Sequence, residues 1–558
     1  MYFSPVKLIL IVVKLILKDI KAVTRGLIVC LTGLLTWSAA IAQTNTGEIG
    51  GIVRDESGGV LPGATVIATH EDTGLSVERV TDVDGRFFLS ALPIGNWEVA
   101  AELPGFSRVV QDGVTLQIGQ TLDLRLRLEL GQLTEEVTVQ AAVPLLQSTN
   151  AEISDVIDNR EVEQIPLNGR QFLQLAQLSD AVVIPPGGTR GAALQQAGPL
   201  PNVGGQRAGH NIYMLDGFKV TDELFNNLVI NPSIDSIQEF KIQKSMYPPE
   251  FGGKASALIN IATKTGTNDF RGSAFTFVRD ERFDAHNFFD PRDTPVPPLD
   301  QRQFGGSFGG PIISNRTFLF LSYEGQRIDR ALTKTFSVPT SAVRNGNFKG
   351  FEQLCDPLTR NPQTGVCGSF FRDNQIPSSR IDPLASRFLQ KVPLPTGGGE
   401  VQNLTANDQL TSDVDQLSVR IDHRFSPNDQ MFGRFSTFDA GDVQPFGTSV
   451  QQETLIPGFG RTLGTKTRNL GLSYTRTLGR SMLNETRFGW MDVDGGQRSL
   501  NRGVDFSGDV GLEGVTRDLR DIGYPQIDTG GFYSAMGDPA SFIYRRNTHF
   551  ELYNNFLI

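Results

Sequence analysis

The side chains that usually carry enzyme chemistry occur singly in this chain. No histidine has a partner four residues along that would complete a zinc-binding pair on a helix; the five are His70, His210, His286, His423 and His549. No phosphate-binding Walker loop is present. Asp280, Glu281 and Asp284 cluster, but the charged end of a strand explains them better than general acid–base catalysis. The sequence therefore predicts a protein that is not an enzyme, with no catalytic residue, cofactor or metal.

Residues 1–42 have the pattern of an export signal. Basic residues precede the apolar run Gly26–Trp37, and Ala40-Ile41-Ala42 places small residues at the cleavage positions. A transmembrane anchor is the alternative because a second apolar stretch, Leu8–Leu17, comes earlier. Neither run reaches the roughly 18 residues that a membrane helix needs. We expect an exported protein whose signal peptide is removed.

Three cysteines occur, and one of them, Cys30, lies in the export segment. Cys355 and Cys367 lie close together in a stretch that reads as a loop. In an exported chain, a disulfide that closes this loop is the expected state. A metal site is disfavoured because no second pair of cysteines or histidines lies nearby.

Length and charge limit the possible classes of protein. The 558 residues suggest three or four domains. The net charge of −10, with no cluster of lysine and arginine, argues against nucleic acid as a partner. After the N-terminus no apolar run is long enough for a membrane helix, but β-barrel strands alternate and leave hydropathy unremarkable. The 59 glycines suit β structure rich in turns.

Three short strands separated by glycine-rich turns are predicted between residues 202 and 268. The first, Asn211–Leu215, stops at the turn dipeptide Asp216-Gly217. In the second, Phe240 and Ile242 share one face and Glu239 and Lys241 the other. The third, 258–263, is continuously apolar, as in a strand buried on both faces.

These strings resemble the plug domain of TonB-dependent outer-membrane transporters. The order NIYMLDG, SIQEFK, EFGG and NIATKTGTN carries the resemblance, together with IPLNGRQFLQLAQL at residues 165–178. The alternative is a small soluble α+β domain. A short amphipathic helix is expected at Phe172–Leu178. Arg170 and Arg207 could pair with a surrounding barrel wall or contact a ligand.

Residues 43–130 are predicted to form a β-sandwich of about seven short strands. In Leu122–Leu128 the leucines alternate with charged residues, as in a strand with one wet face. The segment resembles the carboxypeptidase regulatory-like family, which has a carbohydrate-binding-like fold. Sheet shape supplies no sugar site, so sugar binding is a minor hypothesis. Asp82 and Asp84 could begin a calcium loop, but its closing glutamate is missing and a plain turn is favoured.

A β-branched segment, Leu133–Val139, lies between the sandwich and the plug. Such a segment can add as a strand to the sheet edge of another protein. In the plug family this is the position of the TonB box, so the resemblance assigns TonB interaction to Glu136, Val137, Thr138 and Val139. An ordinary linker or a first plug strand is equally compatible with the residues. No substrate-binding residue can be named.

From residue 269 the chain changes to long alternating strands. Apolar Leu417 to Phe425 alternate with charged residues over about nine positions, the length of a tilted membrane strand. Further strands are expected at 430–438, 468–478 and 482–491, and long external loops at 284–302, 339–415 and 439–466. The string DPLTRNP…IPSSRIDPLA resembles the Oar-like subgroup of the transporters. Family barrels have 22 strands, so residues 269–558 are expected to form a partial barrel of a C-terminally truncated chain.

The predicted fold is therefore mainly β: an N-terminal β-sandwich (43–130), a TonB-box segment and α+β plug (131–268), and a partial antiparallel transmembrane β-barrel (269–558). The resemblance implies a TonB-dependent receptor or transporter of the Gram-negative outer membrane. Its partners would be TonB with the inner-membrane energy-coupling complex, outer-membrane lipid and an unknown external ligand. Alternatives are a non-transporting surface adhesin or carbohydrate-binding protein, and a soluble periplasmic binding module.

Overall fold

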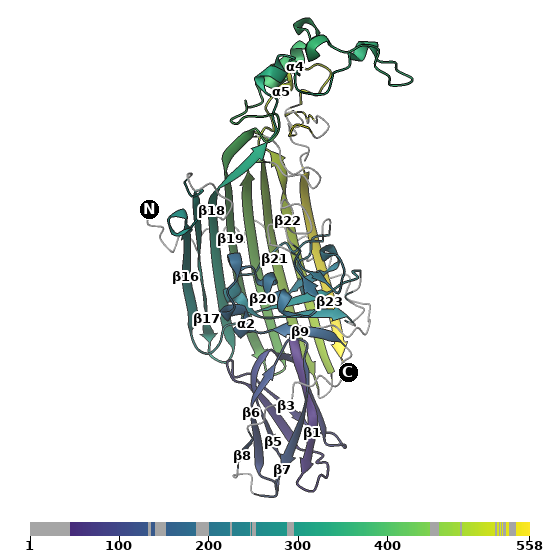
Figure 1. Ribbon diagram of the computed structural model, residues 1–558. Coiled ribbons are helices and arrows are strands. Elements are labelled where there is room, and N and C mark those ends of the chain that lie inside the picture. Colours follow the sequence, from purple (N-terminus) through teal and green to yellow (C-terminus); the bar gives the residue numbers. More distant parts are fainter. Residues whose placement is uncertain are drawn as a thin grey trace.

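The computed structural model describes most of the chain after the N-terminal segment. The described residues are 45–131, 136–139, 152–185, 200–223, 226–245, 247, 251, 253–286, 295–446, 457–479, 482–518, 522–523, 525, 527, 532–534 and 543–557. The predicted export signal lies outside them. Figure 1 shows a β-sandwich at the lower end, a central unit crossed by short strands, a wall of long strands, and an arm at the upper end. The central unit, within residues 152–268, is called the plug below.

The sandwich has two sheets packed on one core. The first has the order β4-β1-β7, with β1 and β7 parallel, and the second has the order β3-β2-β5-β6-β8. Trp97 lies at the centre of the core with no exposed surface, and its indole N–H donates to the Pro93 carbonyl at 3.0 Å. The predicted sandwich is confirmed. Its strands are β1 (Thr46–Asp55), β2 (Thr65–His70), β3 (Ser76–Val80), β4 (Arg86–Pro93), β5 (Gly95–Glu102), β6 (Arg108–Leu116), β7 (Thr121–Leu128) and β8 (Glu136–Val139).

The plug is built on a five-stranded sheet of order β13-β12-β15-β14-β9. Asp216 and Gly217 join β12 to β13, and both have positive φ, 50° and 77°, as a type I′ turn requires. All of β15 is buried, as its apolar sequence predicts. The strands are β9 (Ile153–Ile157), β10 (Val182–Val183), β11 (Asn202–Val203), β12 (Ile212–Leu215), β13 (Phe218–Lys219), β14 (Ile237–Ser245) and β15 (Leu258–Thr263).

Short helices cover one side of the plug sheet. Asp158 caps α2 (Asn159–Gln164) in a capping box with Glu161. The helix expected at Phe172–Leu178 is present as the 3₁₀ helix η2, and Phe172 packs edge-on against Phe240. The other 3₁₀ turns of the plug are η1 (Asn168–Arg170), η4 (Ala208–His210) and η5 (Ile234–Ser236).

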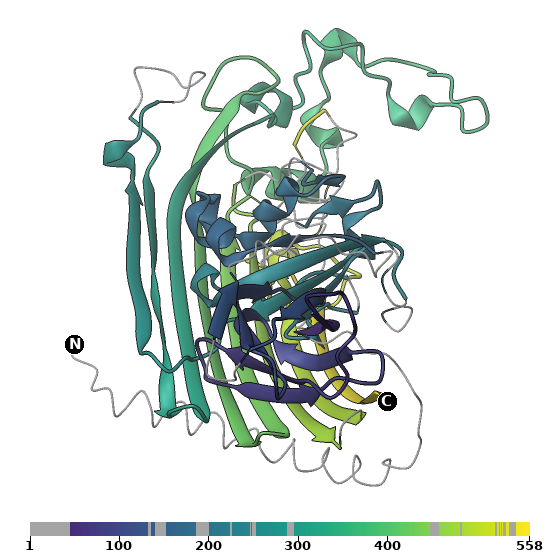
Figure 2. The same ribbon diagram turned by 90° about the horizontal axis from the view of Figure 1, so that it is seen from below.

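The wall is one antiparallel sheet of eight strands paired in chain order, and it curves around one side of the plug (Figure 2). The turns at the lower end are short, and the loops at the upper end are long. Within the described residues, no helix is long and apolar enough to cross a bilayer. The strands are β16 (Arg271–Asp280), β17 (Leu299–Ile313), β18 (Thr317–Phe336), β19 (Leu404–Ser426), β20 (Asp429–Gln444), β21 (Arg461–Leu478), β22 (Met482–Ser499) and β23 (Ile543–Leu557).

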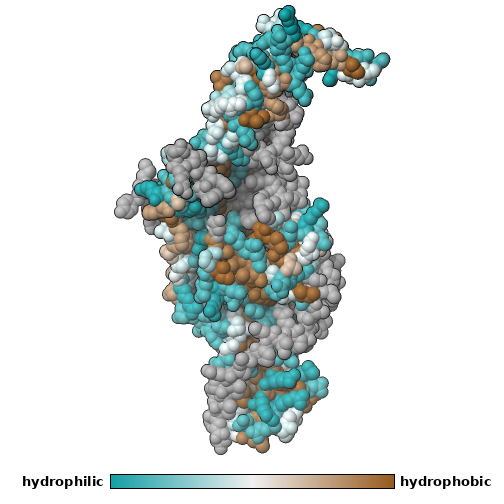
Figure 3. All heavy atoms as spheres, in the orientation of Figure 1, coloured by the Kyte–Doolittle hydropathy of each residue, from teal (hydrophilic) through white to brown (hydrophobic). Residues whose placement is uncertain are grey.

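The wall strands extend beyond the apolar alternation from which they were predicted. The loop bounds predicted at 284–302, 339–415 and 439–466 are wrong, because β17 begins at Leu299, β19 begins at Leu404 and β20 continues to Gln444. In these extensions apolar residues are sparse, so the alternation that marks the middle of each strand is weak there. In Figure 3 hydrophilic colours predominate over the sandwich and the arm, and hydrophobic residues gather on this face at the height of the plug.

The arm (residues 337–403 and 500–518) is held by its own contacts. Phe336, Val338 and Phe459 belong to a small apolar cluster at its base. Its helices are α3 (Ser341–Arg344), α4 (Pro383–Gln390), α5 (Phe506–Val510), η8 (Pro357–Thr359), η9 (Arg372–Asn374) and η10 (Ser378–Arg380), and η7 (Glu281–Phe283) follows β16. Cys355 and Cys367 form a disulfide in the arm, with 5.8 Å between their Cα atoms.

Replacing both cysteines by serine should destabilise the arm alone. A crosslink that closes a loop of this length contributes about 2–3 kcal/mol. Arg360 is exposed inside the closed loop, so trypsin should cleave after it several-fold faster in the Cys355→Ser/Cys367→Ser variant. Cleavage after Lys466, which lies in the wall, is the internal control and should not change. Equal acceleration at both sites would mean that the disulfide stabilises more than the arm.

Candidate functional site

Two arginines on neighbouring wall strands face one plug carboxylate. Arg420 of β19 and Arg434 of β20 are direct cross-strand partners. Like charges in that arrangement repel each other unless a counter-ion lies between them. Asp216, in the β12–β13 turn, supplies it: Arg434 Nε lies 2.7 Å from Oδ2 and Arg420 Nη1 lies 3.2 Å from Oδ1. The side chains of Asp216 and Arg434 have no exposed surface.

Hydrogen bonds from the rest of the plug complete the environment of Asp216. The backbone N–H of Thr263 donates to Oδ1 at 2.9 Å, and its hydroxyl donates to Oδ2 at 2.8 Å. Arg434 also donates to Asn469 Oδ1 at 2.7 Å and to the Leu215 carbonyl at 3.1 Å. A buried charge of this kind is tolerated only when every partner is present. The cluster therefore fixes one position of the plug against the wall.

Two further ion pairs join the plug to other wall strands. Arg545 of β23 pairs with the buried Asp222, whose second oxygen accepts from Asn547 at 3.0 Å. At the opposite edge, Arg170 pairs with Asp235 within the plug and lies 3.3 Å from Glu324 of β18. The guanidinium of Arg170 also stacks 4.0 Å above the Phe275 ring of β16. Of the two arginines singled out from sequence, Arg170 thus contacts the wall, whereas Arg207 is exposed.

One aromatic side chain of the plug fits into a gap in the wall. Phe218, which follows the Asp216-Gly217 turn, is fully buried. It lies over Gly471 of β21 and Gly489 of β22, which face each other across the two strands. A Cβ on Gly471 would stand 2.5 Å from the Phe218 ring, and one on Gly489 would stand 2.9 Å from it. The absence of a side chain at both positions makes the space for the ring.

The plug has a hydrophobic core that is almost entirely its own. Two buried residues of its main apolar cluster, Phe438 and Ala440, come from the wall, and the others come from the plug. The contacts with the wall include buried ion pairs and hydrogen bonds, besides apolar contacts such as that of Val229 with Met491 and Val493. A unit that keeps its core when it leaves a polar surface can move without unfolding.

The sandwich contacts both the plug and the lower rim of the wall. Its loop between β6 and β7 lies on β14, where the Ile118 N–H donates to the Glu239 carboxylate. Lys241 donates to the Gly119 carbonyl at 3.3 Å and pairs at 2.9 Å with Glu152, just before β9. At the rim, the Asn268 N–H donates to the Asp72 carbonyl at 2.9 Å.

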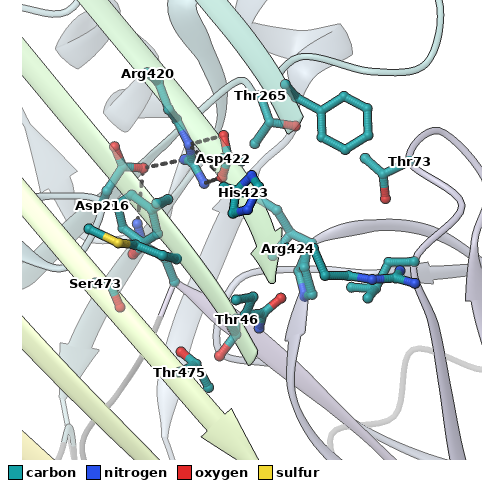
Figure 4. Close-up of a pocket in the computed structure, with 18 of the residues that line it drawn as sticks. Thr46, Thr73, Asp216, Thr265, Arg420, Asp422, His423, Arg424, Ser473 and Thr475 are labelled. Carbon is teal, nitrogen blue, oxygen red and sulfur yellow. Dashed lines mark hydrogen bonds and ion pairs between the residues drawn. The ribbon is translucent and has the colours of Figure 1, made fainter. Parts of the chain in front are cut away.

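A cavity of about 130 Å³ remains where the three units meet. Figure 4 shows Thr46 and Thr73 of the sandwich, Asp216 and Thr265 of the plug, and His423 of the wall around it. Arg420 and Asp422, which pair at 2.9 Å, form part of its lining. Because each unit contributes part of the lining, any relative movement of the units changes this cavity.

Burial raises the pKa of Glu239 to about 7, with a contribution from the charge of Asp158, against the opposing effects of the Ile118 N–H and of Lys241. A carboxyl group whose pKa is raised by folding makes its full contribution to the free energy of unfolding below its pKa in the unfolded chain, near 4.5. That contribution declines as the pH rises to about 7 and is constant above it. The decline amounts to about 3 kcal/mol.

Replacing Glu239 by glutamine should therefore flatten part of the pH dependence of stability. We expect the calorimetric midpoint of the N-terminal units to fall between pH 5 and pH 8 in the parent protein and to fall much less in Glu239→Gln. The matched control is Glu78→Gln, at an exposed glutamate of β3, which should follow the parent. Parallel curves for all three proteins would contradict the assignment.

The structure brings together few of the residues singled out from sequence. The segment Glu136–Val139 forms β8, which pairs in parallel with β6, Arg108 opposite Glu136. It thus lies in the sandwich sheet rather than in the plug. Asp82 holds a plain turn by accepting the N–H groups of Asp84 and Arg86. Among the described residues, no group of three or more acidic, histidine or cysteine side chains is placed to hold a metal ion.

The junction residues themselves were not singled out from sequence as a site. Glu239 and Lys241 were assigned to one face of a strand, and that face is buried, with only 6% and 2% exposure. A usable signal was present in the wall. Arg420 and Arg434 fall at equivalent places on either side of a short turn, so a hairpin pairs two like charges and demands a carboxylate from elsewhere.

Comparison with known proteins gives two family matches. The model of the outer membrane beta barrel domain matches residues 262–558, and that of the carboxypeptidase regulatory-like domain matches residues 48–129. The chain is 26% identical over 311 residues to the TonB-dependent transporter Oar of Myxococcus xanthus. That match covers 53% of this chain, and the chain spans only 28% of the length of this curated relative.

Solved structures also match at low identity. The outer membrane transporter YddB from Escherichia coli is 11% identical with a TM-score of 0.43, over 72% of this chain and 45% of that one. The siderophore receptor PirA from Acinetobacter baumannii is 12% identical with a TM-score of 0.32, over 67% of this chain and 52% of that one.

Proposed function

This chain belongs to the outer membrane beta barrel domain family, and from that premise we propose that it acts as a TonB-dependent transporter or receptor of the Gram-negative outer membrane. An external substrate binds on the side of the arm, and energy-coupled displacement of the plug admits it. The observation that carries the proposal is a plug with its own core, held to the wall by buried ion pairs. Such an interface can open without the plug losing its fold.

We propose that Glu136–Val139 is the segment that TonB engages. A strand at the edge of a sheet offers backbone N–H and C=O groups to an added strand, and β8 ends the order of its sheet among the described strands. The partners are TonB with its inner-membrane complex, and an external ligand whose identity the residues do not specify. The role is non-enzymatic: the work comes from the coupling complex, and this chain supplies binding and gating.

Deleting Glu136–Val139 tests this function. Binding of the purified periplasmic domain of TonB to the protein in outer-membrane vesicles should fall at least tenfold. The matched control, Val137→Ile/Val139→Ile, keeps a β-branched strand and should bind as the parent does. Undiminished TonB binding by the deletion variant would overturn the assignment of the segment. Absence of TonB binding in the parent would favour a surface adhesin instead.

A further inference from the structure

A buried lysine of the plug joins the sandwich to the first residues of the plug. Lys241 of β14 is 2% exposed. Its ammonium contacts the carbonyl of Gly119 in the sandwich and the carboxylate of Glu152, which is 1% exposed, at the start of the plug. Gly119 has φ of +59°, and a Cβ there would stand 3.3 Å from the Lys241 nitrogen. A side chain at position 119 would therefore crowd the Lys241 ammonium.

The same loop continues the strand that carries β8. Strand β6 ends at Leu116, immediately before the docked residues 117–120, and β8 pairs with β6 over four residue pairs. Successive backbone groups of a strand point to opposite sides, so a strand added to the outer edge of β8 need not break its pairing with β6. A partner that engages β8 therefore takes hold of the sandwich as a whole.

The sandwich also contributes to the contact that fixes the plug to the wall. The Asn45 side chain, just before β1, donates to Asp216 Oδ1 at 3.0 Å and accepts from Asn260 of β15 at 3.0 Å. Removal of the sandwich would take one hydrogen bond from the carboxylate that holds Arg420 and Arg434. Losing a donor from a buried carboxylate weakens its whole cluster.

The junction of the plug with the wall and that of the sandwich with the plug are made by different kinds of contact. The plug meets the wall through two buried ion-pair clusters, the partly buried Arg170 cluster, the Phe218 ring and the apolar contact of Val229. The sandwich meets the plug through the contacts to Glu239, Lys241 and Asp216, and it meets the rim through partly exposed groups such as Arg271, which lies 3.1 Å from Asp72. Partly exposed pairs contribute little. The named contacts of the sandwich with the plug are hydrogen bonds, so we expect this junction to separate before that of the plug with the wall.

We propose that the sandwich is a latch on the plug, released at Lys241 before the plug leaves the wall. This inference rests on the proposed function, since it assigns to the sandwich the first step of that opening. Load applied to β8 passes through β6 to the loop at Gly119. Its release exposes Lys241 and withdraws Asn45 from Asp216, which weakens the cluster at Asp216 before the plug moves.

Distances between spin labels test the order of the two steps. One pair, Glu78→Cys in β3 with Asn428→Cys in the turn before β20, reports sandwich against wall, and both positions are exposed. A second pair, Gln177→Cys in η2 with Asn428→Cys, reports plug against wall. The protein is measured in outer-membrane vesicles. The parent should give one narrow distance for each pair.

Lys241→Met removes the ammonium but keeps a long side chain. We expect it to add a broad population at longer distance for the sandwich pair and to leave the plug pair unchanged. Gly119→Ala should have the same effect. Because this variant leaves the plug sequence intact, the effect could not then come from a folding defect of the plug. Lys466→Met removes a cation that is 67% exposed, and it should change neither distance.

An unchanged sandwich distance in both junction variants would overturn the latch. Equal lengthening of both distances would also overturn it, because sandwich and plug would then move as one body. Adding the purified periplasmic domain of TonB to the parent separates this proposal from the function on which it rests. Failure of that domain to bind would overturn the proposed function. It would not change what the Lys241→Met and Gly119→Ala distances show about the contact of the sandwich with the plug. Binding that lengthens only the sandwich distance would support both.

Discussion

Asp216→Asn is expected to unseat the plug from the wall. The substitution keeps the size and the acceptor oxygen of the side chain but leaves the guanidinium groups of Arg420 and Arg434 opposite each other without their shared carboxylate. Removing one partner from a buried ion pair costs about 3–5 kcal/mol, because the remaining charge stays buried. The wall should persist, since its strands pair along their whole length independently of Asp216.

Protection of the plug against trypsin in a urea series measures this effect. The midpoint for cleavage after Lys219 should move to lower urea in Asp216→Asn, with the strand content of the wall unchanged by circular dichroism. The control is Asp439→Asn, which breaks a wall ion pair of 3.0 Å with Lys466 that is more than half exposed. Exposed pairs contribute about 0–1 kcal/mol, so that midpoint should barely move. Equal shifts would show that the cluster has no special role.

The elements that could be predicted from sequence are those with a local cause. Asp216-Gly217 specifies its turn, because only a few residue types accept two positive φ angles in succession. The strands of the wall were found where apolar and charged residues alternate, and they were cut short where apolar residues become sparse, as in Leu404–Gln416. Sparse apolar residues leave only a weak periodic signal, so the ends of such a strand are hard to find from its own sequence.

The junctions depend on contacts between distant parts of the chain. The polar face of β14, Glu239 and Lys241, looks the same in sequence whether water or the sandwich covers it. Likewise, Arg434 resembles any inward-facing charge of a barrel strand until β12 brings Asp216 to it. The segment Glu136–Val139 was separated from the sandwich because a four-residue strand carries too little pattern to show which sheet it joins.

Gly471→Val is expected to prevent the plug from seating by filling the space of the Phe218 ring. The ring already lies 2.5 Å from the place of a Cβ at this position, and it is fully buried. Overpacking a buried site costs about 1–3 kcal/mol. Valine itself suits a strand, so β21 should form normally. Gly441→Val is the matched control: a Cβ on this glycine of β20 meets a single atom at 4.0 Å.

Phe218→Ala should lower the urea midpoint for cleavage after Lys219. Losing a large buried side chain costs about 3–5 kcal/mol. The double variant Phe218→Ala/Gly471→Val distinguishes a fitted contact from two separate defects. If the ring occupies the gap left by the two glycines, the valine fills the space that the ring vacates. The double variant should then lose less of the urea midpoint than the two single variants lose together. Additive losses would mean that Phe218 and Gly471 contribute independently. The ring of Phe218 would then have no steric fit to the gap at Gly471.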